Sequence, residues 1–122
     1  MNEGGVDQLR EPPVSAVESL DGAIVVRLAG ELDLYNAHEV RDALASAAEK
    51  RPERIVVDLA NVEFIDSTAL GVLIEARTKL ENRRAFLLAS PGIETRRALE
   101  ISGLARHFGI HESVDEAVAA SI

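Results

Sequence analysis

The 122-residue sequence contains no cysteine and no tryptophan, and it has only one tyrosine and three phenylalanines. Without cysteine, neither a disulfide framework nor thiolate zinc ligation is available. The scarcity of aromatic side chains leaves leucine, valine, isoleucine and alanine to fill the core. A chain of this length can bury such a core without disulfides or a metal, and we therefore expect one domain.

Basic charge is also scarce, because 13 lysines and arginines stand against 21 aspartates and glutamates, a formal net charge of −8. That balance argues against non-specific binding to nucleic acid or to an anionic membrane surface. No apolar run approaches the roughly 20 residues of a membrane span, and residues 1–5 do not resemble a signal peptide. We expect a cytoplasmic protein that binds another protein or a small molecule, with no nucleic acid and no membrane as partner.

The N-terminal part predicts a tail, a hairpin and a helix. Residues 1–13 show no periodic pattern, which predicts a mobile tail before a domain over residues 14–122. Two β-rich runs, 14–20 and 23–29, are separated by the dipeptide Asp-Gly, a strong signal for a hairpin turn. Asn36, with a glutamate three residues later, resembles a capping box and predicts a helix that ends near the sequence Lys-Arg-Pro.

The rest of the chain alternates between short apolar runs and segments of helical spacing. Strands are predicted at 55–59, 85–89 and 108–110. One helix is predicted to begin near Ser67, a second after Ser90 as its N-cap, and a third after Ser113 as its N-cap. A hairpin followed by strand–helix units predicts an α/β domain in which helices pack on a small mixed sheet.

Three consecutive polar residues, Asp66, Ser67 and Thr68, interrupt an apolar segment where a strand gives way to a helix. In open α/β sheets, ligands and reactions tend to lie at the carboxyl ends of strands. A helix N-terminus also carries about half a positive charge and stabilises an anion. On spacing alone, however, Asp66 or Ser67 acting simply as a helix cap is the favoured interpretation.

Other chemical interpretations of this segment have weaker support. The nucleophile-elbow pattern G-x-S-x-G is absent around Ser67, and the three histidines are scattered along the chain. Neither common glycine-rich phosphate-binding pattern occurs. A metal-ligand spacing is not recognisable among the carboxylates Asp33, Asp58, Glu63 and Asp66. We therefore expect no enzymatic activity, no metal and no cofactor.

Three segments resemble the STAS domain, and more narrowly the bacterial anti-sigma factor antagonists. They are GELDLYNAHEVRDAL at 30–44, RIVVDLANVEFIDSTALGVLIEA at 54–76, and the ISGL turn at 101–104. The block D-S-[ST]-[GA]-[LI]-G is quite specific in that setting, and the G-E-L-D element supports it independently. The resemblance covers nearly the whole chain and implies a mixed sheet of four or five strands with about four helices on it, without catalytic activity.

The resemblance also implies a function. Members of that family bind an anti-sigma factor that is also a serine/threonine kinase, and so free the sigma factor. The kinase phosphorylates the serine that matches Ser67, and a dedicated phosphatase removes the phosphate. Asp66 matches the motif's aspartate, Asp33 the G-E-L-D aspartate near the phosphoacceptor, and Thr68 a second hydroxyl that some members also phosphorylate. Ala69 stands where glycine is common.

The leading expectation is therefore a binding module controlled by phosphorylation. A phosphate on Ser67 would add about −1.5 to −2 charge, which a helix N-terminus tolerates but a partner's covering face does not. Two alternatives are a constitutive STAS scaffold or regulatory subunit of a transporter or sensory assembly, and a nucleotide-binding STAS domain. The sequence does not name the kinase, the sigma factor or the signal that triggers release.

Overall fold

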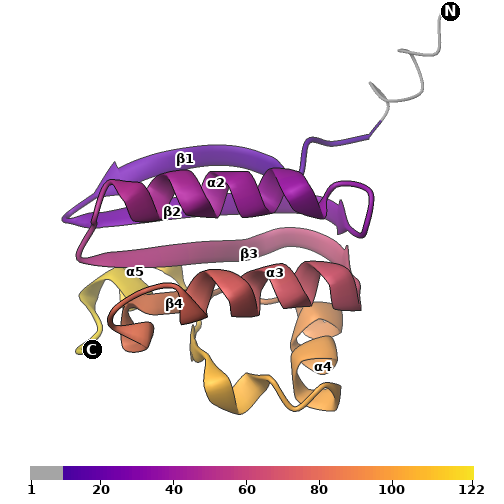
Figure 1. Cartoon of the computed structure of the whole chain (residues 1–122). Helices are drawn as coiled ribbons and strands as arrows, with labels where there is room; N and C mark the ends of the chain where they lie inside the picture. The colour runs from indigo at the N-terminus through magenta and orange to yellow at the C-terminus, as the bar shows by residue number, and fades with distance from the viewer. Residues whose placement is uncertain (1–9) are drawn as a thin grey trace, which may run out of the picture.

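The computed structural model describes residues 10–122, which form one sheet covered by helices (Figure 1). The strands are β1 (Val14–Leu20), β2 (Ala23–Leu32), β3 (Arg54–Ile65), β4 (Phe86–Ala89) and β5 (Gly109–His111). The helices are α2 (Ala37–Glu49), α3 (Ser67–Thr78), α4 (Ile93–Ile101) and α5 (Val114–Ala119), with 3-10 turns η1 (Arg83–Ala85) and η2 (Ala105–His107). The five strands lie in chain order, with β1 antiparallel to β2 and the others parallel. The predicted α/β fold with a small mixed sheet is confirmed.

The central strands β2 and β3 carry buried apolar side chains on both faces, and helices cover both faces of the sheet. Val26 and Val57 are fully buried in the core that includes α2, α3 and α4. Their neighbours Val25 and Val56 are also fully buried, but in a smaller cluster on the other face with Ala117 of α5. Because successive side chains of a strand point to opposite faces, a continuous apolar run is what a doubly covered strand requires. In Figure 1, α2 and α3 lie side by side in front of the sheet and α5 lies behind it.

The hairpin between β1 and β2 forms where the sequence predicts it. Asp21 and Gly22 both have left-handed backbone conformations, with φ of 51° and 85°. Two such residues in a row make the turn whose twist matches a two-residue β-hairpin. Pro13, which precedes β1, is buried, and its carbonyl accepts a hydrogen bond from Ala29 N at 3.0 Å. Most of the predicted N-terminal tail lies outside the described residues.

The predictions that the two central strands end at 29 and 59 were wrong, because β2 continues to Leu32 and β3 to Ile65. The pairing of β3 with β2 shifts register twice, once after Asp58 and once after Val62. Each β-bulge breaks the alternation of apolar and polar side chains that identifies a strand in a sequence. Asp58 supports the first bulge, because its Oδ1 accepts a hydrogen bond from Ala60 N at 3.0 Å.

The second oxygen of Asp58 binds Arg27 of the neighbouring strand, with Oδ2 2.6 Å from Nη1. Asp58 is almost fully buried, so the guanidinium supplies the charge that a buried carboxylate needs. Hydrogen bonds first to Asp58 and then to Glu18 raise the pKa of Arg27 above its ordinary value. The ion pair therefore fixes the register of β2 against β3 immediately before the first bulge.

Two of the predicted helix caps were wrong. Asn36 precedes α2, but its side chain makes no capping hydrogen bond because the surrounding loop already engages it. Ser90 has a left-handed φ of 58° and donates its Oγ hydrogen to the carbonyl of Glu112, so α4 begins only after Gly92. Ser113 does cap α5, since its side chain accepts a hydrogen bond from Glu116 N. Within residues 10–122 no helix is long and apolar enough to cross a membrane.

Arg54, at the start of β3, binds the end of α5, and its substitution tests how much this contact stabilises the fold. Its Nη1 donates to the carbonyls of Ala117 and Ala120 at 2.8 and 2.7 Å. We expect Arg54→Ala to lower the free energy of unfolding by about 1.5–3 kcal/mol, the range for hydrogen bonds to a charged group. Arg54→Lys should lose less, because an ammonium can still reach one carbonyl. Urea unfolding measures both.

The matched control for this measurement is Arg97→Ala. Arg97 is exposed, and its pairing with Glu94 at 3.7 Å is long. Its removal should change stability by no more than about 0.5 kcal/mol. Equal losses for Arg97→Ala and Arg54→Ala would show that the α5 carbonyls do not depend on Arg54.

Candidate functional site

Asp66 is the single residue between β3 and α3, and it caps the helix. Its backbone is extended, with φ −99° and ψ 178°, and its Oδ1 accepts a hydrogen bond from Ala69 N at 2.9 Å. This geometry satisfies one of the backbone N–H groups that every helix N-terminus leaves unpaired. Of the two candidate caps, Asp66 therefore takes the role, and Ser67 is the first residue of the helix as predicted.

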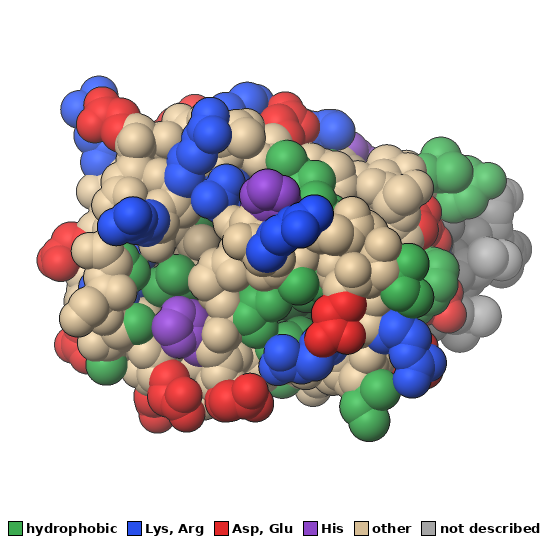
Figure 2. Space-filling model, turned by 90° about the horizontal axis from the view of Figure 1, so that it is seen from below, with side chains coloured by type: hydrophobic (Ala, Val, Ile, Leu, Met, Phe, Trp, Pro, Cys, Tyr) green, Lys and Arg blue, Asp and Glu red, His purple; other side chains and the backbone are tan. Residues whose placement is uncertain are grey.

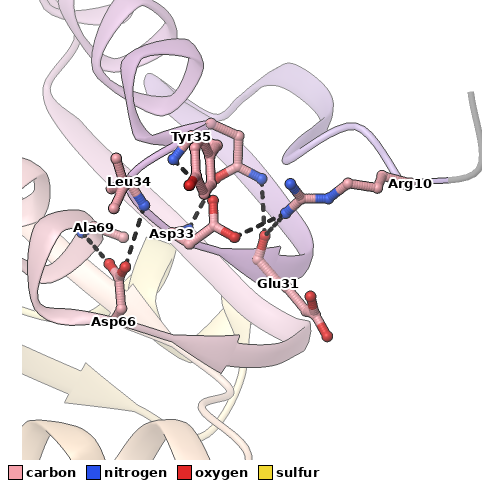
Figure 3. Close-up of polar contacts among 8 residues, drawn as sticks. Arg10, Glu31, Asp33, Leu34, Tyr35, Asp66 and Ala69 are labelled. Carbon is pink, nitrogen blue, oxygen red and sulfur yellow. Dashed lines mark hydrogen bonds and ion pairs between the residues drawn. The ribbon is translucent and has the colours of Figure 1, made fainter. Parts of the chain in front are cut away.

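Two other polar groups of Asp66 bind the end of β2 and the loop between β2 and α2. Its Oδ2 accepts a hydrogen bond from Leu34 N at 3.1 Å, and its own N–H donates to the carbonyl of Leu32 at 3.0 Å. Figure 3 shows the Asp66 carboxylate directed at both the loop and the start of α3. One side chain thus joins two segments that lie more than thirty residues apart in sequence.

Asp33 shapes the same loop from within. Its Oδ1 accepts a hydrogen bond from Tyr35 N at 3.0 Å, and its Oδ2 lies 3.1 Å from Nη2 of Arg10 (Figure 3). Asn36 completes the arrangement, because its side chain accepts from Asp33 N and donates to the carbonyl of Glu31. The structure therefore places Asp33 one residue from the Leu34 N–H that Asp66 holds.

Ser67 and Thr68 occupy the first turn of α3, and both are exposed. Within residues 10–122, no hydrogen bond engages either hydroxyl group, and none joins Ser67 to a histidine. The four residues that the sequence singles out, Asp33, Asp66, Ser67 and Thr68, thus meet at the carboxyl ends of β2 and β3. A helix N-terminus with a free, solvent-facing hydroxyl suits the addition of an anionic group.

Three exposed apolar side chains lie in the β2–α2 loop and at the end of β3, and the sequence analysis did not identify them. Leu34 is 62% exposed, Tyr35 75% and Phe64 53%. Leu34 and Tyr35 belong to the loop that Asp66 holds, and Phe64 lies two residues before Asp66 on β3. The scarcity of aromatic residues is the signal that could have found them: Phe86 and Phe108 pack together in the core, whereas the other two lie beside the motif. Exposed aromatic groups are typical anchors of protein interfaces.

The carboxylates of this region do not form a metal site. The carboxylate oxygens of Asp33 and Asp66 accept hydrogen bonds from backbone N–H groups and from Arg10. Asp58 pairs with Arg27. Across the described part of the chain, no group of three or more His, Asp or Glu residues is placed to hold a metal ion. Every contact seen at this site serves to fix the loop and the start of α3.

Comparison with known proteins agrees with this geometry. The sequence matches the family model of the STAS domain over residues 15–117. It is 36% identical over 95 residues to an anti-sigma F factor antagonist from Paenibacillus polymyxa, covering 75% of this chain and 80% of that one. It is 29% identical over 98 residues to an anti-sigma-F factor antagonist from Mycobacterium tuberculosis, covering 80% of each.

Solved structures give the same result. The crystal structure of an anti-sigma factor antagonist from Mycobacterium paratuberculosis superposes with a TM-score of 0.81 at 31% identity, covering 90% of this chain and 96% of that one. A family model that matches most of the chain, together with a fold and a motif that agree with it, identifies the family. The chain belongs to the STAS domain family.

Proposed function

We propose that this protein is an anti-sigma factor antagonist whose binding is controlled by phosphorylation of Ser67. In its unphosphorylated form it binds an anti-sigma factor that is also a serine/threonine kinase, and so releases the sigma factor. A phosphatase acting on phosphorylated Ser67 resets the cycle, and the protein has no catalytic activity of its own. Family membership and the names of its relatives support the role. The observation that supports control of binding by phosphorylation is the exposed position of Ser67, at the start of a helix that another residue caps.

A phosphate on Ser67 is compatible with the fold. The cap of α3 is the Asp66 carboxylate, and the Ser67 hydroxyl makes no hydrogen bond within the described residues, so its modification removes no contact seen there. The helix dipole offers about 0.3–1 kcal/mol to an anion at this position. The carboxylates of Asp66 and Glu63 partly offset that gain. Phosphorylation therefore changes the charge of the surface and leaves the fold in place.

The same phosphate is incompatible with a covering partner. The exposed side chains of Leu34, Tyr35 and Phe64 lie at the same edge of the sheet as Ser67 and offer a partner apolar contacts there. A partner that buries them would also desolvate a phosphate, which costs several kcal/mol unless a cation pairs with it. Arg10, the cation hydrogen-bonded into this loop, is already paired with Asp33. Because each 1.4 kcal/mol is a tenfold change in affinity, the charge alone is enough to break a complex.

The first prediction from this proposed function concerns the position of the phosphate. Ser67 and Thr68 are both exposed, so burial does not exclude either of them. Thr68 lies about 100° further around the helix and is β-branched, which restricts its approach to a kinase. Mass spectrometry after incubation with the cognate kinase and ATP should find phosphate on Ser67 and little on Thr68. Ser67→Ala is the control and should remain unmodified; phosphate mainly on Thr68 would contradict the assignment.

The second prediction separates binding from folding at Ser67. Because Asp66 supplies the cap, Ser67→Ala should change stability by no more than about 0.5 kcal/mol and should keep its affinity for the anti-sigma kinase. Ser67→Asp and Ser67→Glu should fold equally well but bind at least tenfold more weakly, a loss of about 1.4 kcal/mol. Calorimetric titration and thermal unfolding measure the two quantities.

Ser46→Asp serves as the matched control, because Ser46 is exposed near the far end of α2. It introduces the same charge and should leave the affinity unchanged. If Ser67→Ala and Ser67→Asp bind equally well, charge at this position is not the switch. A constitutive STAS scaffold or regulatory subunit would then be the better description.

The third prediction concerns the apolar anchors. Tyr35→Ala and Phe64→Ala should each weaken the complex by at least about 1 kcal/mol, because truncated aromatic anchors lose buried contact area. Since both side chains are exposed in the free protein, its stability should hardly change. Ile93→Ala is the control, because Ile93 is 77% exposed on α4. A loss of affinity for Ile93→Ala as large as for Tyr35→Ala would show that the partner covers a different surface.

A further inference from the structure

A groove with a volume of about 310 Å³ lies away from the Ser67 site. Six basic side chains line it: Arg77, Arg83, Arg84, Arg106, His107 and His111. They come from the end of α3, from η1, from η2 and from β5. Figure 2 shows the face seen from below, where blue and purple side chains gather around a hollow and red ones lie mostly towards the margins.

The position of the groove follows from the parallel sheet. η1 leads directly into β4, and η2 comes just before β5, so the groove lies at the amino ends of these two strands. Ser67 follows the carboxyl end of β3, which runs parallel to β4. The groove and Ser67 are therefore at opposite edges of the sheet, and a ligand in one does not touch the other.

The charge of the groove is unusual for this chain. The protein has a formal net charge of −8, yet no aspartate or glutamate is among the described residues that line the groove, where Ser121 and Ile122 lie beside the basic side chains. Arg27, Arg41 and Arg96 each pair with a carboxylate elsewhere. Within residues 10–122, no such ion pair engages any of the four arginines of the groove. Like charges that share a hollow repel one another, and an anionic ligand would offset that repulsion.

The walls and the floor of the groove indicate a small ligand. Arg77 is held over the ring of Phe108, with its guanidinium carbon 6.0 Å from the ring centroid. Leu87 and Phe108 are buried and provide an apolar floor. The volume is at the lower end of the range of about 300–1,000 Å³ for small-molecule pockets. A protein partner would instead need roughly 800 Å² of surface on each side.

We propose that this groove binds a compact anion with two or more phosphate groups, of the diphosphate or triphosphate class. Guanidinium groups bind phosphate oxygens in pairs with fixed geometry, which makes arginine the usual residue for this task. Arg83 and Arg84 lie on one side of the groove in η1, and Arg106 lies on another in η2. An anion that engages both η1 and η2 needs more than one charged group. A monophosphate therefore binds more weakly than a diphosphate.

Calorimetric titration of the full chain with inorganic pyrophosphate and tripolyphosphate tests the proposal. We expect saturable binding that orthophosphate reproduces only weakly. The double variant Arg83→Gln/Arg84→Gln and the single variant Arg106→Gln should each lose at least tenfold in affinity. Arg77 stays unchanged in these variants because it packs on Phe108. The control is Arg96→Gln/Arg97→Gln, which removes an equal number of arginine charges from α4 outside the groove and should bind within threefold of the unaltered protein.

The absence of saturable pyrophosphate binding would overturn the proposal, as would equal losses in the groove variants and in the control. Tighter binding of a ten-residue glutamate peptide than of pyrophosphate, with the same dependence on Arg83 and Arg84, would overturn it in favour of a protein docking surface. Ser67→Asp should bind pyrophosphate as the unaltered protein does. A failure of the phosphorylation switch would leave this result intact, so the two proposals can fail separately.

Discussion

The Asp66 carboxylate is the contact on which the arrangement of the site depends. One of its oxygens caps α3 through Ala69 N, and the other holds the β2–α2 loop through Leu34 N. Asp66 accepts the hydrogen bond of an N–H group at the start of α3. The neighbouring Ser67 hydroxyl therefore makes no hydrogen bond within the described residues. A site of modification next to a helix is most useful when its chemistry can change without loss of the cap. Asp66 thereby separates the stability of α3 from the chemical state of Ser67.

The path of β3 brings that carboxylate to the loop. Two bulges insert residues into β3 relative to β2, and the strand still recovers its pairing at Leu32 and Ile65. Each bulge bends its strand and increases the local twist. Asp58 supports the first bulge through Ala60 N while it pairs with Arg27. The ion pair at the centre of the sheet therefore helps to set where β3 ends and where α3 begins.

The parts of the fold that could be predicted from the sequence depend on local patterns. The Asp-Gly turn, the apolar run through Val56 and Val57, and the start of α3 after Asp66 each follow from neighbouring residues. The far half of β3 could not be predicted, because its bulges break the alternation. The roles of Asn36 and Ser90 could not be predicted either. The side chain of Asn36 binds the backbone of its own loop at Glu31 and Asp33, and that of Ser90 binds the carbonyl of Glu112, 22 residues away, so neither caps a helix. The motif singles out four polar residues that the structure places together, whereas the exposed apolar side chains at the same edge needed the structure.

The two edges of the sheet differ in chemical character, and α3 connects them. The helix begins at Ser67 with carboxylates beside it, and it carries Arg77 of the basic groove in its last turn. Twelve residues of helix span about 18 Å. Exposed charges are largely screened beyond about 8 Å at physiological ionic strength. A phosphate on Ser67 therefore acts on whatever covers its own edge, and the field it adds at the groove is small. Under the two proposals, a protein partner at the Ser67 edge and a small anion in the groove would therefore each bind without the other.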